Sequence, residues 1–227
     1  MIKTIRAGWF TYANILWSAF EKGWNYRRRA ESDMLKIKCE GCGRRAPSFE
    51  VVDYGSMDTG YKQLCRRCFN MKAATAADLD DFEHVEFEPV RLTDSAGKPH
   101  EFHFRTFMFG TGVALDAFEL RDGNPAGYQF QVIAEPEEDQ LALLGRLIEK
   151  VRRALAVKHI ADSEHGLQIA EPLVVRGLID WDSEQGGSTP LLVIDGREVS
   201  WDEFGRMISG FEGFQFKFEI RDKSEEI

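Results

Sequence analysis

The sequence predicts an α+β fold, in which a small four-cysteine module precedes an antiparallel sheet packed with one long and one short helix. Three observations predict it. All four cysteines of the 227 residues lie between positions 39 and 68, in two matched pairs. Segments of alternating apolar and polar residues follow, without the regular β-α-β order of a parallel sheet. Two helical patterns, at about 136–159 and 200–211, interrupt these segments.

Charge is distributed unevenly along the chain. Residues 1–72 contain 14 Lys and Arg against 7 Asp and Glu, a net charge of +7. Because the whole chain has a formal net charge of −9, the remainder carries −16. Acidic surfaces repel phosphate backbones and basic surfaces attract them. Any contact with nucleic acid is therefore expected in the N-terminal third.

Residues 1–33 are predicted to form an aromatic and basic N-terminal helix or extension. The apolar residues that share one helical face are Trp9, Ala13, Leu16, Trp17, Phe20 and Trp24. Three interpretations stay open: the helix docks on the protein or on a second copy, it contacts a membrane surface, or it is a dispensable extension before Met34. Membrane contact is the less favoured of these, and the run is too short and interrupted to span a bilayer.

The cysteine spacing predicts a metal site. Cys39-x2-Cys42 is followed by an interval of 22 residues and then by Cys65-x2-Cys68. Two residues between cysteines allow both thiolates to face one point, and two such pairs supply the four ligands of a closed tetrahedral Zn²⁺ site. A closed site leaves no position for substrate or water, so the expected role of the zinc is structural.

Disulfide bonds are the main alternative to metal. No convincing secretory signal is present, and the reducing cytoplasm, which is the expected location, favours thiolate ligands over cystine. Iron–sulfur sites usually have other spacings, and a redox pair needs only one CxxC. Gly41 and Gly43 suit a tight turn at the first pair because glycine tolerates positive φ angles.

The region 34–82 is predicted to be one zinc-binding domain. Its central part is predicted to be a β-hairpin, with strands at 47–54 and 61–64 and a turn at 55–60. The alanine-rich residues 69–82 predict a helix. This order resembles a treble-clef or ribbon-type zinc finger, with Cys39, Cys42, Cys65 and Cys68 as the matching residues. The resemblance implies a structural metal that serves nucleic-acid binding, protein binding or local stability.

Basic residues flank the cysteines. Four of them form a candidate contact surface for nucleic acid: Arg44, Arg45, Arg66 and Arg67. The same residues also suit a structural use, because they neutralise the excess negative charge of four thiolates on a divalent ion. The sequence leaves both interpretations open.

Residues 83–227 are predicted to form an acidic α+β domain. Strands are expected at 84–92, 101–109, 113–120 and 128–134, as an antiparallel meander. A long helix is expected to start at Pro136, with a buried stripe at Leu141, Leu144, Ile148, Val151 and Leu155. Strands at 172–181 and 190–196 then precede a short helix with a capping box at Ser200 and Glu203. A last strand is expected at 214–221, with Phe214, Phe216, Phe218 and Ile220 facing inward.

No catalytic constellation stands out in this acidic domain. His100 and His103 are expected to point to opposite faces of a strand, as satisfied or solvated residues. The layout, with its ending "IDGREVSWDEFGRMISGFEGFQFKFEI", resembles an uncharacterised bacterial family of unknown function. We therefore expect a zinc-binding, non-enzymatic interaction or regulatory protein, with a protein partner or self-association. The alternative is a nucleic-acid-binding regulator that uses the basic finger.

Overall fold

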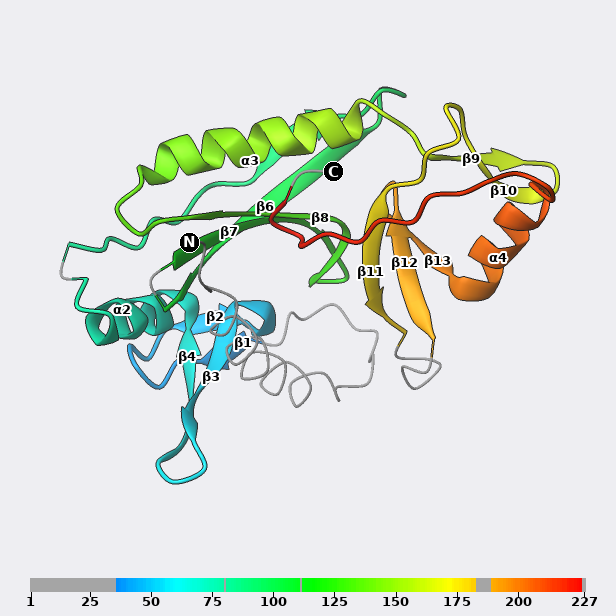
Figure 1. Ribbon diagram of the computed structural model, residues 1–227. Coiled ribbons are helices and arrows are strands. Elements are labelled where there is room, and N and C mark those ends of the chain that lie inside the picture. Colours follow the sequence, from blue (N-terminus) through cyan, green and yellow to red (C-terminus); the bar gives the residue numbers. More distant parts are fainter. Residues whose placement is uncertain (1–35, 80, 111, 183–188, 226–227) are drawn as a thin grey trace, which may run out of the picture.

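The computed structural model describes residues 36–79, 81–110, 112–182 and 189–225. This part of the chain has a mixed α+β architecture, mostly antiparallel sheet with three α-helices, as the sequence predicts. The Trp-rich stretch predicted as a helix lies outside the described residues. Among the described residues, no helix is both long and apolar enough to cross a membrane. Figure 1 shows three modules that follow one another along the chain.

The cysteine-rich module contains two small hairpins and a helix. Its elements are β1 (Lys36–Lys38), β2 (Arg45–Pro47), a 3-10 helix (Ser48–Glu50), β3 (Val51–Ser56), β4 (Gly60–Cys65) and α2 (Arg66–Ala76). β1 pairs with β2 and β3 pairs with β4, both antiparallel, which confirms the predicted hairpin. α2 begins immediately after Cys65, earlier than the alanine-rich composition predicts. We refer to residues 36–76 as the finger.

The central module is a four-stranded meander. Its strands are β5 (Val90–Thr93), β6 (Pro99–Phe109), β7 (Gly112–Arg121) and β8 (Asn124–Ala134), in that order across the sheet. The sequence predicts this meander correctly, except that residues 84–89 form no strand. β5 pairs only with residues 99–102 of β6, because α2 occupies the next part of the β6 edge.

The two faces of the central sheet have different coverings. Val113, Leu115 and Ala117 of β7 belong to the main core, together with the buried side of α3 (Gln140–Leu155). Alternate residues of β7 point to the other face, where Phe118 contacts Phe49 of the finger. Figure 1 accordingly shows α3 and the finger on opposite sides of the sheet.

Helix α3 begins later than predicted. Asp139 caps it, because its carboxylate accepts a hydrogen bond from the Leu141 N–H at 2.9 Å, so Pro136 is not the helix start. The buried stripe is Leu143, Leu147, Val151 and Leu155. Leu141, predicted to be buried, exposes 67% of its surface. Of the predicted stripe, Val151 and Leu155 are buried and Leu144 is partly buried against the core, so the prediction is wrong chiefly at Leu141.

The third module follows α3. It contains the hairpin of β9 (Ile160–Ser163) and β10 (Gly166–Ile169), the sheet of β11 (Gly177–Trp181), β12 (Pro190–Ile194) and β13 (Arg197–Ser200), and the helix α4 (Trp201–Ser209). Ser200 Oγ accepts a hydrogen bond from the Glu203 N–H, so the predicted N-cap is confirmed. Ile160, Ile194, Val199 and Met207 form a separate small core.

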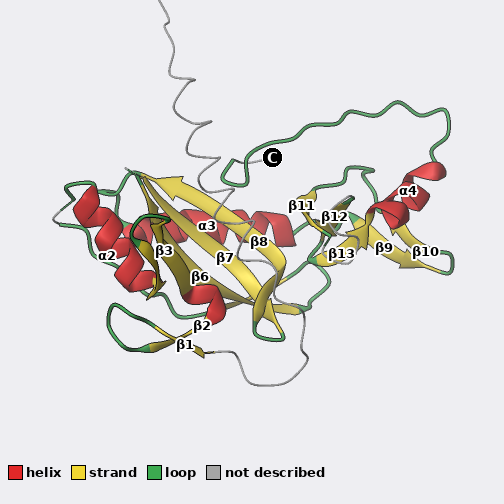
Figure 2. Ribbon diagram, turned by 90° about the horizontal axis from the view of Figure 1, so that it is seen from below, coloured by secondary structure: helices red, strands yellow, loops and turns green. Residues whose placement is uncertain are grey.

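The last predicted strand is wrong. Residues 214–221 have no strand partner in the described part of the chain. They form a long extended loop that connects α4 to the C-terminal end of the chain, as Figure 2 shows. The side chains predicted to face inward are exposed instead: Phe214 by 69%, Phe216 by 91%, Phe218 by 67% and Ile220 by 69%.

Candidate metal centre

The structure brings the four cysteines together in space. The sulfur atoms of Cys39, Cys42, Cys65 and Cys68 all lie within 4.8 Å of one another. Cys42 Sγ and Cys65 Sγ are 3.8 Å apart. A tetrahedral ion with metal–sulfur bonds of about 2.3 Å separates its sulfur ligands by about 3.8 Å, whereas a disulfide bond is about 2.05 Å long. The four thiols are free, and together they can hold one metal ion.

The backbone around the first cysteine pair prepares a site for negative charge. Cys39 Sγ is buried and accepts hydrogen bonds from the Gly41 N–H at 3.3 Å and the Cys65 N–H at 3.1 Å. Such donors stabilise a thiolate because they lie close to its charge. The finger therefore solvates this sulfur with its own amides in place of water.

Glycine has two different uses at this turn. Gly43 has a φ angle of +74°, as the sequence predicts. Gly41 has no positive φ. A Cβ atom at position 41 would lie 3.1 Å from Cys68 Sγ and 3.2 Å from Leu64 Cδ2. The reason for glycine at position 41 is thus the close approach of the two cysteine pairs.

The thiols differ in acidity. The pKa of Cys42 is lowered to about 6, because the backbone N–H and the guanidinium of Arg44 donate to its sulfur. Burial and, to a lesser extent, the neighbouring thiols raise the pKa of Cys68 to about 12. Four thiolates this close repel one another, so their joint deprotonation requires a cation among them. This donor set fits a metal ion that prefers sulfur ligands.

Helix α2 connects the cysteine site to the central sheet. Asn70 is fully buried, and its amide pairs with the free edge of β6. Its Nδ2 donates to the Thr106 carbonyl at 2.9 Å, and its Oδ1 accepts from the Met108 N–H at 3.0 Å. One side chain thus replaces a neighbouring strand at this point, which satisfies edge groups that are otherwise unpaired.

Aromatic and ionic contacts extend this interface between the finger and the sheet. The Phe69 and Phe107 rings stack at a centroid distance of 5.0 Å. Arg105 donates to the Phe49 carbonyl at 3.3 Å and to the buried carboxylate of Asp116 at 2.8 Å. The finger is therefore packed into the molecule rather than attached by a linker alone.

The four candidate arginines occupy different environments. Arg44, Arg45 and Arg67 are exposed. Arg66 lies over the Phe107 ring at 4.9 Å, and its Nε has no hydrogen-bond partner among the described residues. Burial lowers the pKa of Arg66 to about 10. Arg66 therefore contributes to the interface between α2 and the sheet, while the other three side chains face solvent.

A buried charge cluster, which the sequence did not predict, joins the central module to the segment that follows α3. The Asp94 carboxylate accepts a hydrogen bond from Lys158 Nζ at 2.7 Å and lies 3.2 Å from His100 Nε2. His100 Nδ1 lies 2.8 Å from Glu119 Oε1. Each ring nitrogen of His100 therefore faces a carboxylate. Asp94 also accepts from the Ala96 and Lys98 N–H groups, so it is the hub of this cluster.

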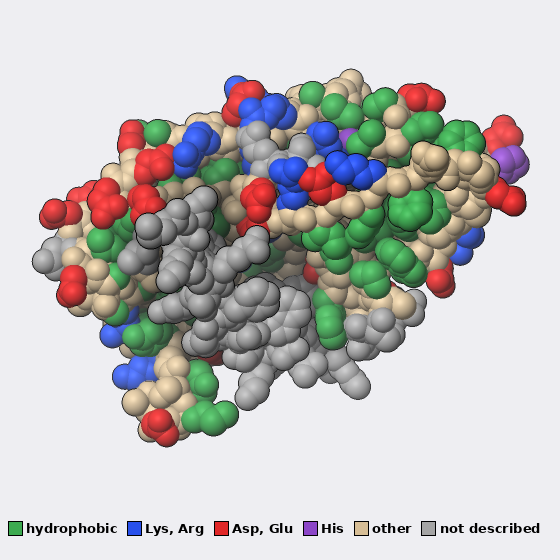
Figure 3. All heavy atoms as spheres, viewed as in Figure 1, with side chains coloured by type: hydrophobic (Ala, Val, Ile, Leu, Met, Phe, Trp, Pro, Cys, Tyr) green, Lys and Arg blue, Asp and Glu red, His purple; other side chains and the backbone are tan. Residues whose placement is uncertain are grey.

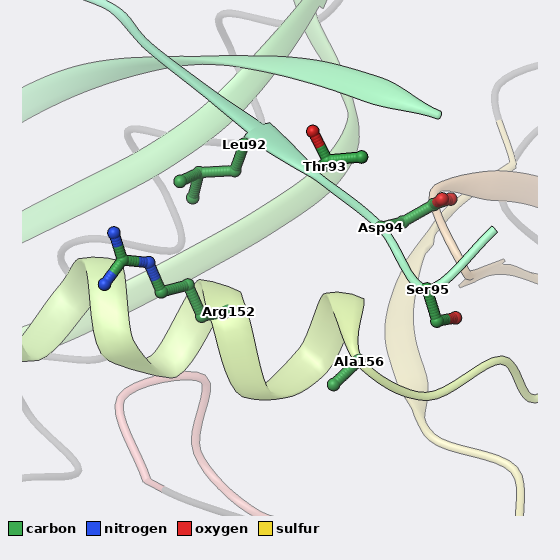
Figure 4. A pocket seen from close by; sticks show the side chains of 6 residues that line it. All are labelled: Leu92, Thr93, Asp94, Ser95, Arg152 and Ala156. Atoms are coloured by element: carbon green, nitrogen blue, oxygen red, sulfur yellow. The ribbon is translucent and has the colours of Figure 1, made fainter. Parts of the chain in front are cut away.

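A pocket of about 430 Å³ lies beside this cluster. Its lining residues are Leu92, Thr93, Asp94 and Ser95 from β5 and the turn after it, and Arg152 and Ala156 from the end of α3. Figure 4 shows the Asp94 carboxylate pointing away from Arg152. Lys158 and His100 engage that carboxylate.

Comparison with protein-family models gives three matches, and each is to a domain of unknown function. Residues 38–80 match the Domain of unknown function (DUF7685), residues 83–156 match DUF7686, and residues 159–225 match DUF7713. These segments correspond to the finger, to the central sheet with α3, and to the third module. Two of them divide the region 83–227, for which the sequence predicts one domain. Searches of curated proteins and of solved structures gave no significant match. The chain is therefore similar, segment by segment, to three domains whose descriptions name no activity.

Proposed function

We propose that Cys39, Cys42, Cys65 and Cys68 bind one Zn²⁺ ion in a structural role. The observation that carries this proposal is the cluster of four sulfur atoms within 4.8 Å. Zinc is the metal that four thiolates in two CxxC pairs most often hold. The order of CxxC pair, hairpin, CxxC pair and helix supports the treble-clef resemblance. With four protein ligands, the ion has no open position for chemistry, so its role is to fix the finger on the sheet.

The proposed zinc site supports a non-enzymatic interaction or regulatory protein. The favouring observation is the apolar surface that the fold leaves exposed, chiefly Phe214, Phe216, Phe218 and Ile220. Monomeric proteins rarely expose contiguous apolar patches of this kind unless the patch binds something. In this proposal the metal holds the first module in place, and the third module makes the contact.

Elemental analysis of protein purified without chelator tests the metal assignment. We expect about one zinc per chain and no stoichiometric iron, because the spacing and geometry suit a mononuclear four-sulfur site. Protein that folds and contains no zinc would contradict the proposal, and so would thiols that are oxidised in a freshly prepared cell extract.

Nucleic-acid binding is the second candidate function, and the exposure of Arg44, Arg45 and Arg67 favours it. Its test is the Arg45→Ala/Arg67→Ala double variant, since Arg44 is bonded to Cys42 and its loss would disturb the metal site. For a nucleic-acid binder we expect affinity to fall as salt rises, and the salt slope of this variant to be smaller by about two. The matched control is Arg152→Ala/Arg206→Ala, two exposed arginines outside the finger. Absent or salt-insensitive binding would contradict this role.

A further inference from the structure

The segment 214–221 has the composition of a β-strand but pairs with no strand among the described residues. Its apolar residues alternate with Gln215, Lys217, Glu219 and Arg221, and every residue of the segment is exposed. Figure 3 shows hydrophobic and charged side chains side by side on the face that the segment crosses. A strand with one apolar and one charged row is stable only beside another strand. The described part of the chain provides none.

Both ends of this segment are attached to the molecule. It leaves α4 after Ser209, and its far end is held by Lys150, whose Nζ donates to the Lys223 and Glu225 carbonyls at 2.9 and 2.8 Å. The matched domain at 159–225 includes the whole segment. The segment is therefore an integral part of the third module, presented to solvent between two fixed points.

The charged row has a specific order. Lys217 Nζ lies 2.9 Å from Glu219, and Arg221 also bonds Glu219, so one carboxylate lies between two cations on the same face. In an antiparallel pair, residues directly opposite each other lie on the same face, and opposite charges there are favourable. The order of positive and negative charges therefore limits the registers in which two copies of this segment can pair.

We propose that segment 214–221 pairs antiparallel with the same segment of a second copy of this chain, with Phe218 on the two-fold axis. This register places Lys217 opposite Glu219 of the second copy, twice by symmetry. It also places Phe216 opposite Ile220 and Phe218 opposite Phe218. The contact is isologous and closes at two copies. The inference names the partner and the surface of the interaction role proposed above, and it rests on that role.

Neighbouring registers are disfavoured by charge. A shift that puts Lys217 on the axis brings the two Lys217 side chains opposite each other. A shift that puts Glu219 on the axis opposes the two carboxylates and sets Lys217 against Arg221. Like charges directly opposite are destabilising. Of the registers centred on residues 217, 218 and 219, only the one centred on Phe218 pairs opposite charges. A register centred on Ile220 sets Glu219 opposite Arg221, but it also sets Lys217 opposite Lys223.

The size of the contact sets its strength. Three phenylalanines and one isoleucine per copy, exposed by 67 to 91%, present on the order of 500 Å² of apolar surface. Edge-to-edge pairing places both apolar rows on one face of a two-stranded ribbon, where neighbouring side chains cover one another only in part, so two copies together bury less than about 1,000 Å², as in weak interfaces. We therefore expect a dimer that forms reversibly at micromolar concentration.

Sedimentation velocity of the full-length protein, from about 1 to about 100 μM, tests this pairing. We expect the wild type to shift from monomer to dimer over this range. Lys217→Glu or Glu219→Lys alone weakens dimerisation about tenfold, because each creates two like-charge pairs. The double variant Lys217→Glu/Glu219→Lys restores it, because the opposite signs are exchanged. The matched control Arg91→Glu, a charge reversal of an exposed ion pair on β5, leaves it unchanged.

Three outcomes would overturn the pairing. The first is a wild type that stays monomeric over the whole range, and the second is a dimer that none of the charge variants affects. The third is a monomer in which removal of residues 1–33 increases hydrogen exchange at 214–221, which would assign the apolar row to the N-terminal stretch. Zinc content is measured on the same samples. A zinc-loaded monomer contradicts only the pairing, and a zinc-free dimer contradicts only the metal site.

Discussion

Replacing Cys65 with serine is expected to release the zinc and to separate the finger from the central sheet. Cys65 is buried, precedes the first residue of helix α2 and belongs to the small core of the finger. A serine hydroxyl is a poor zinc ligand, and metal binding in such small modules supplies most of their folding free energy. We expect less than about a tenth of wild-type zinc and a fall of more than about 4 kcal/mol in the free energy of unfolding.

Hydrogen exchange locates this effect within the molecule. Because Asn70 and Phe69 dock α2 on β6, loss of the metal should remove protection from residues 36–76 and from the Met108 amide, which donates to Asn70. The control is Gln63→Ser, which introduces serine at an exposed position of the same strand. Full zinc occupancy in the Cys65→Ser protein would show that this residue is not a ligand.

Replacing Asp94 with asparagine is expected to be the most destabilising single change outside the metal site. The substitution preserves size but leaves Lys158 and His100 without the carboxylate that holds them. Removing one partner of a buried charged network costs roughly 3–5 kcal/mol, because the remaining charges stay desolvated. The measurement is denaturant unfolding at neutral pH. The control is Asp162→Asn, which removes an exposed pair with Arg197 and should cost less than about 1 kcal/mol.

This difference between Asp94→Asn and the wild type should depend on pH in one direction. Lys158, above all, holds the pKa of Asp94 far below its usual range in the folded protein. The stabilisation is therefore complete above the unfolded pKa of about 4, and it decreases as pH falls below that value. We expect the wild type and the variant to converge in stability on acidification. A difference that is constant from neutral pH to about pH 3 would contradict the assigned role of this carboxylate.

The sequence is most informative where chemistry is tied to local spacing. Two CxxC pairs indicate a common ligand point because two intervening residues set the direction of both thiolates, and the structure places the four sulfurs together. The alternation in 101–134 likewise predicts the meander, since each strand there pairs with its sequence neighbour. In both cases, the determining contacts are local or between adjacent elements.

The sequence is less informative where a partner is distant. Asp94 and Lys158 are far apart in the chain, and the sequence around each of them does not indicate its partner. Nothing near Asn70 indicates that its amide will meet the edge of β6 and exclude residues 84–89 from the sheet. In α3, two leucine stripes share Val151 and Leu155, and packing on the central sheet buries the one that includes Leu143. The pattern at 214–221 predicts a strand but cannot name its partner.

Zinc K-edge X-ray absorption of the purified full-length protein tests the central claim most directly, because it reports the ligands of the ion themselves. The proposed site predicts four sulfur ligands at about 2.3 Å and no nitrogen or oxygen ligand. The spectrum should be the same with and without added salt, since all four ligands come from the chain. A light-atom ligand in the first shell, fewer than four sulfurs, or a sample without zinc would contradict the assignment of Cys39, Cys42, Cys65 and Cys68 as a closed structural site.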